Sequence, residues 1–205
     1  MIAIVDYGMG NVRSLRNAFE YLGEDVIVTS DRDELASADR IVLPGVGAFG
    51  DAMRAIRERD LQAFLTRQAL EVKKPILGVC LGMQLFAKSS SEHGNHEGLG
   101  WIDADIRRLA VPAPLKVPHV GWNELHFSPD DWLFKGIRSG EANFYFVHSF
   151  HMACHRGQDL IATTDYGSPV TAVVRSGNLI AAQFHPEKSQ DNGLKMLGNW
   201  VQHTF

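Results

Sequence analysis

The sequence of 205 residues carries 20 basic and 24 acidic side chains, a formal net charge of -4 and 45% hydrophobic residues. This content is enough for one sizeable hydrophobic core. The charges are interspersed, which argues against nucleic acid as the main partner, and no apolar run reaches the roughly 18 residues of a membrane span. The first residues, MIAIVDYG, lack a basic leader region, and Cys80 and Cys154 do not form a disulfide framework. We therefore expect a cytoplasmic protein with free thiols.

Short β-branched runs alternate with helical patterns in the first half of the chain. The expected strands cover residues 2–5, 25–29, 40–44 and 75–79. The expected helices run over 12–22 with Gly23 as C-cap, from Ser30 or Asp31 onward, over 51–72 with a break near Asp60, and over 81–89. Nearly continuous apolar strands separated by helices predict a parallel sheet covered on both faces.

The pattern changes after Ser89, where SSSEHGNHEGLG predicts a polar, glycine-rich loop. Strands are expected near 101–109, 119–126, 143–148, 159–164, 170–175 and 178–184, with a hairpin signal at 175–179. A last helix is expected over about 189–203. The chain shows no repeat, low-complexity tract or linker. We expect a three-layer α/β fold in one domain over 1–205, with a mostly parallel central sheet flanked by helices and an antiparallel extension.

One short stretch, GVCLG at residues 78–82, has the form of a nucleophile elbow with cysteine as its central residue. A strand-to-helix turn this tight forces strained backbone angles on Cys80, and the flanking glycines avoid collisions. In such a turn the backbone N–H of Leu81 faces an oxyanion formed on a substrate that the thiol attacks. The pattern alone is weak, because free cysteine is among the most often buried residues.

A cysteine nucleophile needs a base, and His185 is the candidate among nine histidines. It follows the apolar run NLIAAQF, at the C-terminal end of an expected strand, where open α/β sheets place their chemistry. Glu187 stands two residues later and is able to orient the imidazole. No metal site is predicted, because His151, Cys154 and His155 at a strand end do not converge on one side.

Several motifs together resemble the class I glutamine amidotransferases. They are DYGMGN (6–11), LPGVGAFGDAM (43–53), PILGVCLGMQLF (75–86), PHVGWN (118–123), YFVHSF (145–150) and FHPEKSQDNG (184–193). They span nearly the whole chain, and within the family they resemble the branch that supplies ammonia for histidine biosynthesis. The resemblance implies that Cys80 attacks the amide of L-glutamine, that His185 acts as acid and base, and that Glu187 orients His185.

The resemblance also assigns residues around this triad. The PGVG loop (44–47) supplies a second oxyanion donor from Val46 or Gly47, and its glycines permit a peptide flip that holds the site inactive. Gln84, Glu92 and the backbone of Ser149 and Phe150 bind the substrate's α-amino and α-carboxylate groups. Gln84 also lies near the thiol by its i+4 helical spacing, which is an independent argument. No cofactor is implied.

Ammonia released into water becomes ammonium, which is not a nucleophile, so a second protein must receive it directly. By resemblance this partner is a (β/α)₈ cyclase that forms a heterodimer with the chain and makes imidazole glycerol phosphate and AICAR. The candidate interface residues are Asn11, Trp122, Asn123, Tyr145 and Lys188.

Three alternatives stay open at this point. A paralogous subunit feeds ammonia to surface-sugar amidination. A stand-alone γ-glutamyl hydrolase or peptidase has the same fold. A non-catalytic partner-binding module is the third, and the intact triad argues against it.

Overall fold

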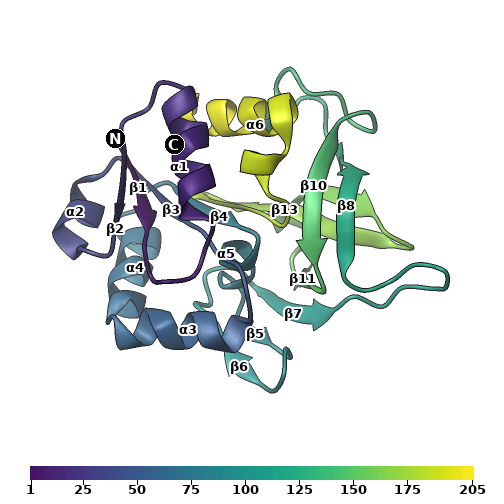
Figure 1. Ribbon diagram of the computed structural model, residues 1–205, viewed down its shortest axis with the longest axis horizontal. Helices are drawn as coiled ribbons and strands as arrows, with labels where there is room; N and C mark the ends of the chain where they lie inside the picture. Colours follow the sequence, from purple (N-terminus) through teal and green to yellow (C-terminus); the bar gives the residue numbers. More distant parts are fainter.

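The computed structural model describes all 205 residues and is built around an eight-stranded mixed sheet (Figure 1). Five neighbouring strands are parallel, in the order β2 (Val26–Thr29), β1 (Ile2–Val5), β3 (Arg40–Leu43), β4 (Ile76–Val79) and β14 (Leu179–Ala182). Three antiparallel strands follow, in the order β13 (Pro169–Ser176), β12 (Leu160–Asp165) and β9 (His126–Phe127). The predicted parallel sheet with an antiparallel extension is thereby confirmed.

The two faces of this sheet belong to two separate hydrophobic cores. Side chains alternate along a strand, so Ile2 and Ile4 of β1 enter one core while Ala3 and Val5 enter the other. Helices α1 (Val12–Tyr21) and α6 (Gln190–Gln202) cover the first face. Helices α2 (Arg32–Ser37), α3 (Phe49–Glu58) and α4 (Leu61–Leu70) cover the second. Strands buried on both sides require apolar residues at every position, which explains the runs in the sequence.

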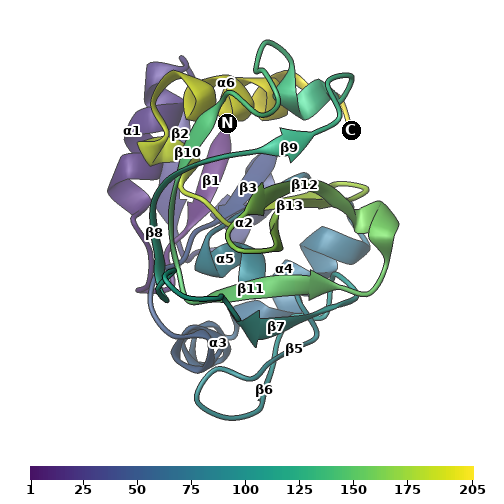
Figure 2. The ribbon, with the colours of Figure 1, turned by 90° about the vertical axis from the view of Figure 1, so that its right-hand side faces the viewer.

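Two smaller sheets flank the antiparallel half, each packed against a different hydrophobic core (Figure 2). An antiparallel ribbon pairs β8 (His119–Glu124) with β10 (Asn143–His148). A four-stranded sheet has the order β11 (Phe150–Cys154), β7 (Ala104–Arg108), β5 (Ser89–Ser90) and β6 (His96–Glu97). Only Ser149 separates β10 from β11, so the chain passes at this residue from the ribbon into the other sheet. The short helices are α5 (Leu81–Gln84), η1 (Trp132–Phe134), η2 (Gly157–Asp159) and η3 (Pro186–Lys188).

The helix boundary signals are confirmed in detail. Gly23 follows α1 with a φ of 86°, a left-handed conformation that glycine adopts without strain. The carboxylate of Asp31 accepts hydrogen bonds from the backbone N–H groups of Asp33 and Glu34 and caps α2. Asp60 adopts a φ of 53° and separates α3 from α4. The expected hairpin joins β13 to β14.

Three expectations differ from the structure. The expected loop after Ser89 contains β5 and β6, and a strand, β11, follows β10 directly. The helix expected over 81–89 is only the four-residue α5. The carbonyls of Leu85, Phe86 and Ala87 accept hydrogen bonds from the segment 99–102 instead of continuing the helix. Tertiary pairing thus overrides the local helical pattern. No helix is both long and apolar enough to cross a membrane.

Candidate active site

Cys80 occupies a strained turn between β4 and α5. Its φ is 55° and its ψ is -109°, and its own N–H donates to the carbonyl of Ala182 on the neighbouring strand at 2.8 Å. A Cβ atom on Gly82 would overlap the carbonyl of Leu43, and one on Gly78 would lie 2.9 Å from the carbonyl oxygen of Gly82. The two glycines are therefore required because backbone packs directly against them. The predicted elbow is present.

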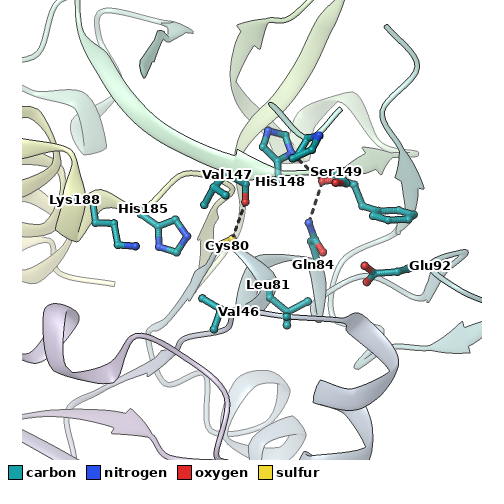
Figure 3. A pocket seen from close by; sticks show the side chains of 13 residues that line it. Val46, Cys80, Leu81, Gln84, Glu92, Val147, His148, Ser149, His185 and Lys188 are labelled. Atoms are coloured by element: carbon teal, nitrogen blue, oxygen red, sulfur yellow. Dashed lines mark hydrogen bonds between the residues drawn. The ribbon is translucent and has the colours of Figure 1, made fainter. Parts of the chain in front are cut away.

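His185 leaves the end of β14, the strand next to β4, and reaches the same site. Its Nδ1–H donates to Oε1 of Glu187 at 2.8 Å, and both side chains are buried. This bond fixes the orientation of the imidazole. The other ring nitrogen, Nε2, has no hydrogen-bond partner within the chain. The thiol of Cys80 and the imidazole of His185 thus line the same cavity (Figure 3), and the carboxylate of Glu187 is hydrogen-bonded to the imidazole, as expected from the sequence.

The charge state of His185 is set by competing effects. Burial lowers its pKa, but the charge of the nearby Cys80 sulfur and the hydrogen-bonded Glu187 carboxylate outweigh burial and raise the pKa to about 9. No hydrogen bond within normal length joins the thiol to Nε2 in this conformation, although the thiol is close enough to act on the pKa. The imidazole is therefore held as imidazolium at neutral pH, ready to donate a proton.

A cavity of about 350 Å³ opens over the thiol. It collects residues from the elbow, the PGVG loop, the β10–β11 junction and η3. The residues expected from the sequence that line it are Cys80, His185, Leu81, Val46, Gly47, Gln84, Glu92, Ser149, Phe150 and Lys188. Pro118, Val147 and His148 complete the lining. The volume suits a small polar molecule such as an amino acid.

Gln84 is anchored on the side of the cavity away from His185 (Figure 3). Its Nε2 donates to the carbonyl of Phe150 at 3.0 Å and to Oε1 of Gln183 at 3.1 Å. Glu92 accepts the N–H of Phe49 at 2.7 Å, so its carboxylate lies at the start of α3 and at the edge of the cavity. These contacts hold an amide and a carboxylate toward the cavity.

The PGVG loop occupies one of the two expected oxyanion donors, the N–H of Leu81. The N–H of Leu81 donates to the carbonyl of Gly45 at 3.3 Å, so that N–H is occupied in this conformation. The hydroxyl of Tyr7, a buried side chain, donates to the carbonyl of Pro44 at 2.7 Å. The N–H of Val46 takes part in no hydrogen bond within the chain. The loop is thus held over the elbow by two carbonyls.

The candidate interface residues lie outside the cavity, apart from Lys188. Trp122 is exposed and contacts Tyr145 across the β8–β10 ribbon at 5.9 Å between ring centroids. The Lys188 ammonium lies 5.9 Å above the ring of Tyr145. Asn123 is half-buried and donates to the carbonyl of Asp165, and Asn11 precedes α1. Only Trp122, Tyr145 and Lys188 form a continuous patch.

Four residues with polar side chains at or near this site received no assignment from the sequence. Gln183 is fully buried and donates toward the Cys80 thiol at 3.9 Å. Tyr7, His119 and His148 are also buried and hydrogen-bonded. The two histidines lie inside motifs PHVGWN and YFVHSF, so their positions were visible, but only the tertiary structure pairs them.

The sequence profile described as "Glutamine amidotransferase class-I" matches residues 3–203. A protein of Nitrobacter winogradskyi, "Imidazole glycerol phosphate synthase subunit HisH 2", is 49% identical over 98% of this chain and 97% of its own length. "Imidazole glycerol phosphate synthase subunit HisH" of Rhodopirellula baltica is 47% identical over 96% of this chain and 95% of its own. A protein of the same name from Sulfurimonas denitrificans is 46% identical, over 99% and 98%.

Solved structures share the fold at lower identity. "Structure of PurLQS from Thermotoga maritima" superimposes with a TM-score of 0.73 and 21% identity, over 98% of this chain and 96% of that one. "Crystal structure of glutamine amidotransferase" gives a TM-score of 0.71 and 20% identity, over 98% of each chain. At this identity the likeness concerns the fold alone.

Proposed function

Because the chain belongs to the class-I glutamine amidotransferase family, we propose that it is the glutaminase subunit of an imidazole glycerol phosphate synthase. The observation that carries the proposal is the meeting of Cys80 and His185 in one cavity that Gln84 also lines, with Glu187 hydrogen-bonded to His185. The near-full-length identity of 46–49% to the three synthase subunits described above supports this function over a stand-alone hydrolase or peptidase.

The chemistry follows from the arrangement of the triad. The Cys80 sulfur, as a thiolate beside the His185 imidazolium, attacks the side-chain amide carbon of glutamine and forms a tetrahedral oxyanion. The His185 imidazolium gives its proton to the nitrogen as the C–N bond breaks, so ammonia leaves and a γ-glutamyl thioester remains. The now neutral imidazole takes a proton from water as the water oxygen attacks the thioester. Glutamate is then released, and the thiolate is restored beside the imidazolium. Glu187 holds the imidazole throughout.

The oxyanion requires two backbone donors, and a single rotation supplies both. The 45–46 peptide is trans, so its carbonyl and its N–H point in opposite directions. Its carbonyl now accepts from Leu81. Turning this peptide group over frees the Leu81 N–H and brings the Val46 N–H toward the thiol. Gly47, at a φ of 105°, lies one residue beyond the moving peptide. The chain alone is therefore proposed to be weakly active until the loop turns.

The partner proposed is a (β/α)₈ cyclase that docks over the cavity mouth and receives ammonia before it is protonated. The products of the pair would be imidazole glycerol phosphate and AICAR, in histidine biosynthesis. The patch of Trp122, Tyr145 and Lys188 adjoins the cavity and is the proposed core of the contact. A cytoplasmic location, where thiols stay reduced, belongs to the same proposal, and both cysteines are free thiols.

The test compares two nitrogen sources for the chain assembled with its cyclase. Cys80→Ala and His185→Ala should each lower glutamine-dependent synthesis at least about 10³-fold while synthesis from ammonium salts persists. Cys154→Ala replaces the other free cysteine and should leave both activities intact. Loss of both activities in the two triad variants would mean that these residues serve folding or docking. Rescue of a histidine-requiring strain by the pair separates histidine synthesis from sugar amidination.

A further inference from the structure

A chain of hydrogen-bonded side chains leads from β8 to the substrate side of the cavity. Asn123 Nδ2 lies 3.3 Å from His119 Nε2, and His119 Nδ1 lies 3.0 Å from His148 Nε2. His148 Nδ1 lies 2.9 Å from the carbonyl oxygen of Phe150. We refer to Asn123, His119 and His148 as the histidine relay. It ends on the same carbonyl that accepts from Gln84 (Figure 3).

The direction of every bond in the relay is fixed by its last acceptor. The Phe150 carbonyl has no proton, so His148 must donate through Nδ1 and accept through Nε2. His119 must then donate through Nδ1 and accept at Nε2 from the Asn123 amide. All three donors therefore point toward the cavity. The arrangement requires that both imidazoles are neutral.

The surroundings of the relay hold both rings in this state. His119 is stacked between Phe146 and Tyr166, with ring centroids 4.8 and 4.0 Å away. His119 and His148 pair directly across the β8–β10 ribbon and are 3% and 5% exposed. Burial lowers the pKa of His119 to about 4 and that of His148 to about 3. A buried polar network that is fully satisfied is rigid and specific.

The relay sets the geometry of a group that faces the substrate. Gln84 donates both of its amide hydrogens, one to the Phe150 carbonyl and one to Gln183 Oε1. Its own Oε1 receives no hydrogen bond within the chain and remains an acceptor at the cavity. An acceptor there suits the α-ammonium of an amino acid. The position of the Phe150 carbonyl, which His148 holds, thus decides where this acceptor lies.

We propose that His148 and His119 are positioning residues for glutamine binding, because the histidine relay holds the β10–β11 junction and, through the Phe150 carbonyl, Gln84. This inference rests on the proposed function. It predicts an effect on glutamine binding that declines with distance along the relay, largest at His148 and smallest at Asn123. Because neither imidazole reaches the thiol through a hydrogen bond, the chemical step at Cys80 should be little affected.

The test uses a matched pair of substitutions in the full chain. The Asn side chain places an amide donor where Nδ1 of His148 stands, whereas Leu has the same shape without the donor. Alkylation of Cys80 by iodoacetamide is measured with increasing glutamine. Half-maximal protection should need about tenfold more glutamine in His148→Leu than in His148→Asn. Without glutamine, both variants should be alkylated at the same rate. With the cyclase present, KM should follow the same order and kcat should change little.

Two outcomes would overturn the inference in different ways. Equal protection in the Asn and Leu variants, with the unsubstituted chain protected, would overturn the role of the relay alone. Absence of both protection and glutamine turnover in the unsubstituted chain would overturn the proposed function and the relay's role with it. Should His148→Leu fail to fold, His119→Asn and His119→Leu give the same comparison one bond further out, with an expected difference of about threefold.

Discussion

Three buried histidines near one cavity are held in different protonation states. His185 contacts Glu187 and lies near Cys80, and the pKa of His185 is raised to about 9. His119 and His148 have only neutral partners and low exposure, and their pKa values fall to about 4 and 3. The neighbouring carboxylate and thiol thus separate a residue suited to proton transfer from residues suited to fixed hydrogen bonding.

The raised pKa of His185 predicts how activity depends on pH. The proton on the departing ammonia comes from the imidazolium, so glutaminase kcat/KM should fall as pH rises through about 9. Glu187→Gln removes a cause that raises this pKa, so the fall should begin at lower pH and activity should drop about 10²-fold. Glu97→Gln, at an exposed position on β6, is the control. A profile unchanged by Glu187→Gln would contradict the assignment.

The two neutral histidines predict the opposite dependence for stability. Their pKa values lie below the unfolded value of 6.5, so the unfolded chain binds more protons as pH falls below about 6.5. Their contribution is therefore complete above that pH and is lost progressively toward pH 4 and 3, at up to about 1.4 kcal/mol per pH unit for each. When the free energy of unfolding is measured by urea titration at several pH values between 5 and 7, it should change less steeply with pH in His119→Asn than in the unsubstituted chain. The exposed His126→Asn should keep the original slope.

At the scale of elements, the elbow and the PGVG loop are packed backbone against backbone. Tyr7 and Leu81 hold successive carbonyls of the loop, at Pro44 and Gly45. Turning the 45–46 peptide breaks only the second of these bonds directly, but the first restrains the adjoining peptide. The loop conformation seen in the structure is thus stabilised by Tyr7, in the segment that follows β1, as well as by the elbow.

Removing the Tyr7 hydroxyl should ease the turning of the loop. Tyr7→Phe deletes one hydrogen bond, worth about 1 kcal/mol, from the closed conformation. Glutaminase activity of the chain without its partner should rise up to about fivefold, and thermal stability should fall slightly. Tyr21→Phe, which changes an exposed tyrosine on α1, should change neither. A lower partner-free activity in Tyr7→Phe would show that the hydroxyl supports the active loop conformation instead.

The glycines of the chain differ sharply in how much space surrounds them for an added side chain. Gly82→Ala would force a methyl group into the Leu43 carbonyl, so we expect a destabilisation of about 3 kcal/mol or loss of the fold. Gly157→Ala meets no atom within 4 Å and lies outside the glycines with positive φ, so it should change stability by less than about 0.5 kcal/mol. Denaturant titration of both variants makes the comparison. Equal stabilities would refute the packing argument.

At the scale of the whole molecule, the cavity adjoins an exposed apolar surface on the β8–β10 ribbon. Val120, Trp122 and Val147 are large apolar side chains exposed on the β8–β10 ribbon, and Val46 is exposed on the PGVG loop. Val46 and Val147 also line the cavity. A partner that covers the ribbon therefore also covers the cavity mouth, which is the geometry that direct transfer of ammonia requires.

Trp122 should dominate affinity for the proposed cyclase. An exposed tryptophan against a tyrosine is typical of an interface hot spot, so Trp122→Ala should weaken the complex about 30-fold. Tyr21→Ala removes a more exposed aromatic residue on α1, away from the ribbon, and should leave the dissociation constant unchanged. Titration calorimetry with the cyclase provides both values. Equal affinities for all three proteins would place the interface elsewhere.

Local signals predicted much of this molecule because they act over short stretches. Gly23, Asp31 and Asp60 mark helix ends through their own backbone preferences, and the parallel strands were apparent from continuous apolar runs. The short α5 was not predictable, because distant N–H groups take the carbonyls that would have extended it. The residues of the triad were visible as an elbow and a strand-ending His-Pro-Glu. The histidine relay and the Tyr7 contact depend on the pairing of strands and loops far apart in sequence.

The position of β14 has a consequence for the order in which the protein becomes an enzyme during synthesis. This strand follows β4 by about a hundred residues in the chain, yet it lies in the interior of the sheet, between β4 and β13. Until it is inserted, β4 exposes an open edge and Cys80 has no base, since His185 follows β14 directly. A nascent chain therefore carries its nucleophile while about a hundred further residues are translated, without being able to use it. The strand that closes the sheet also switches on the chemistry.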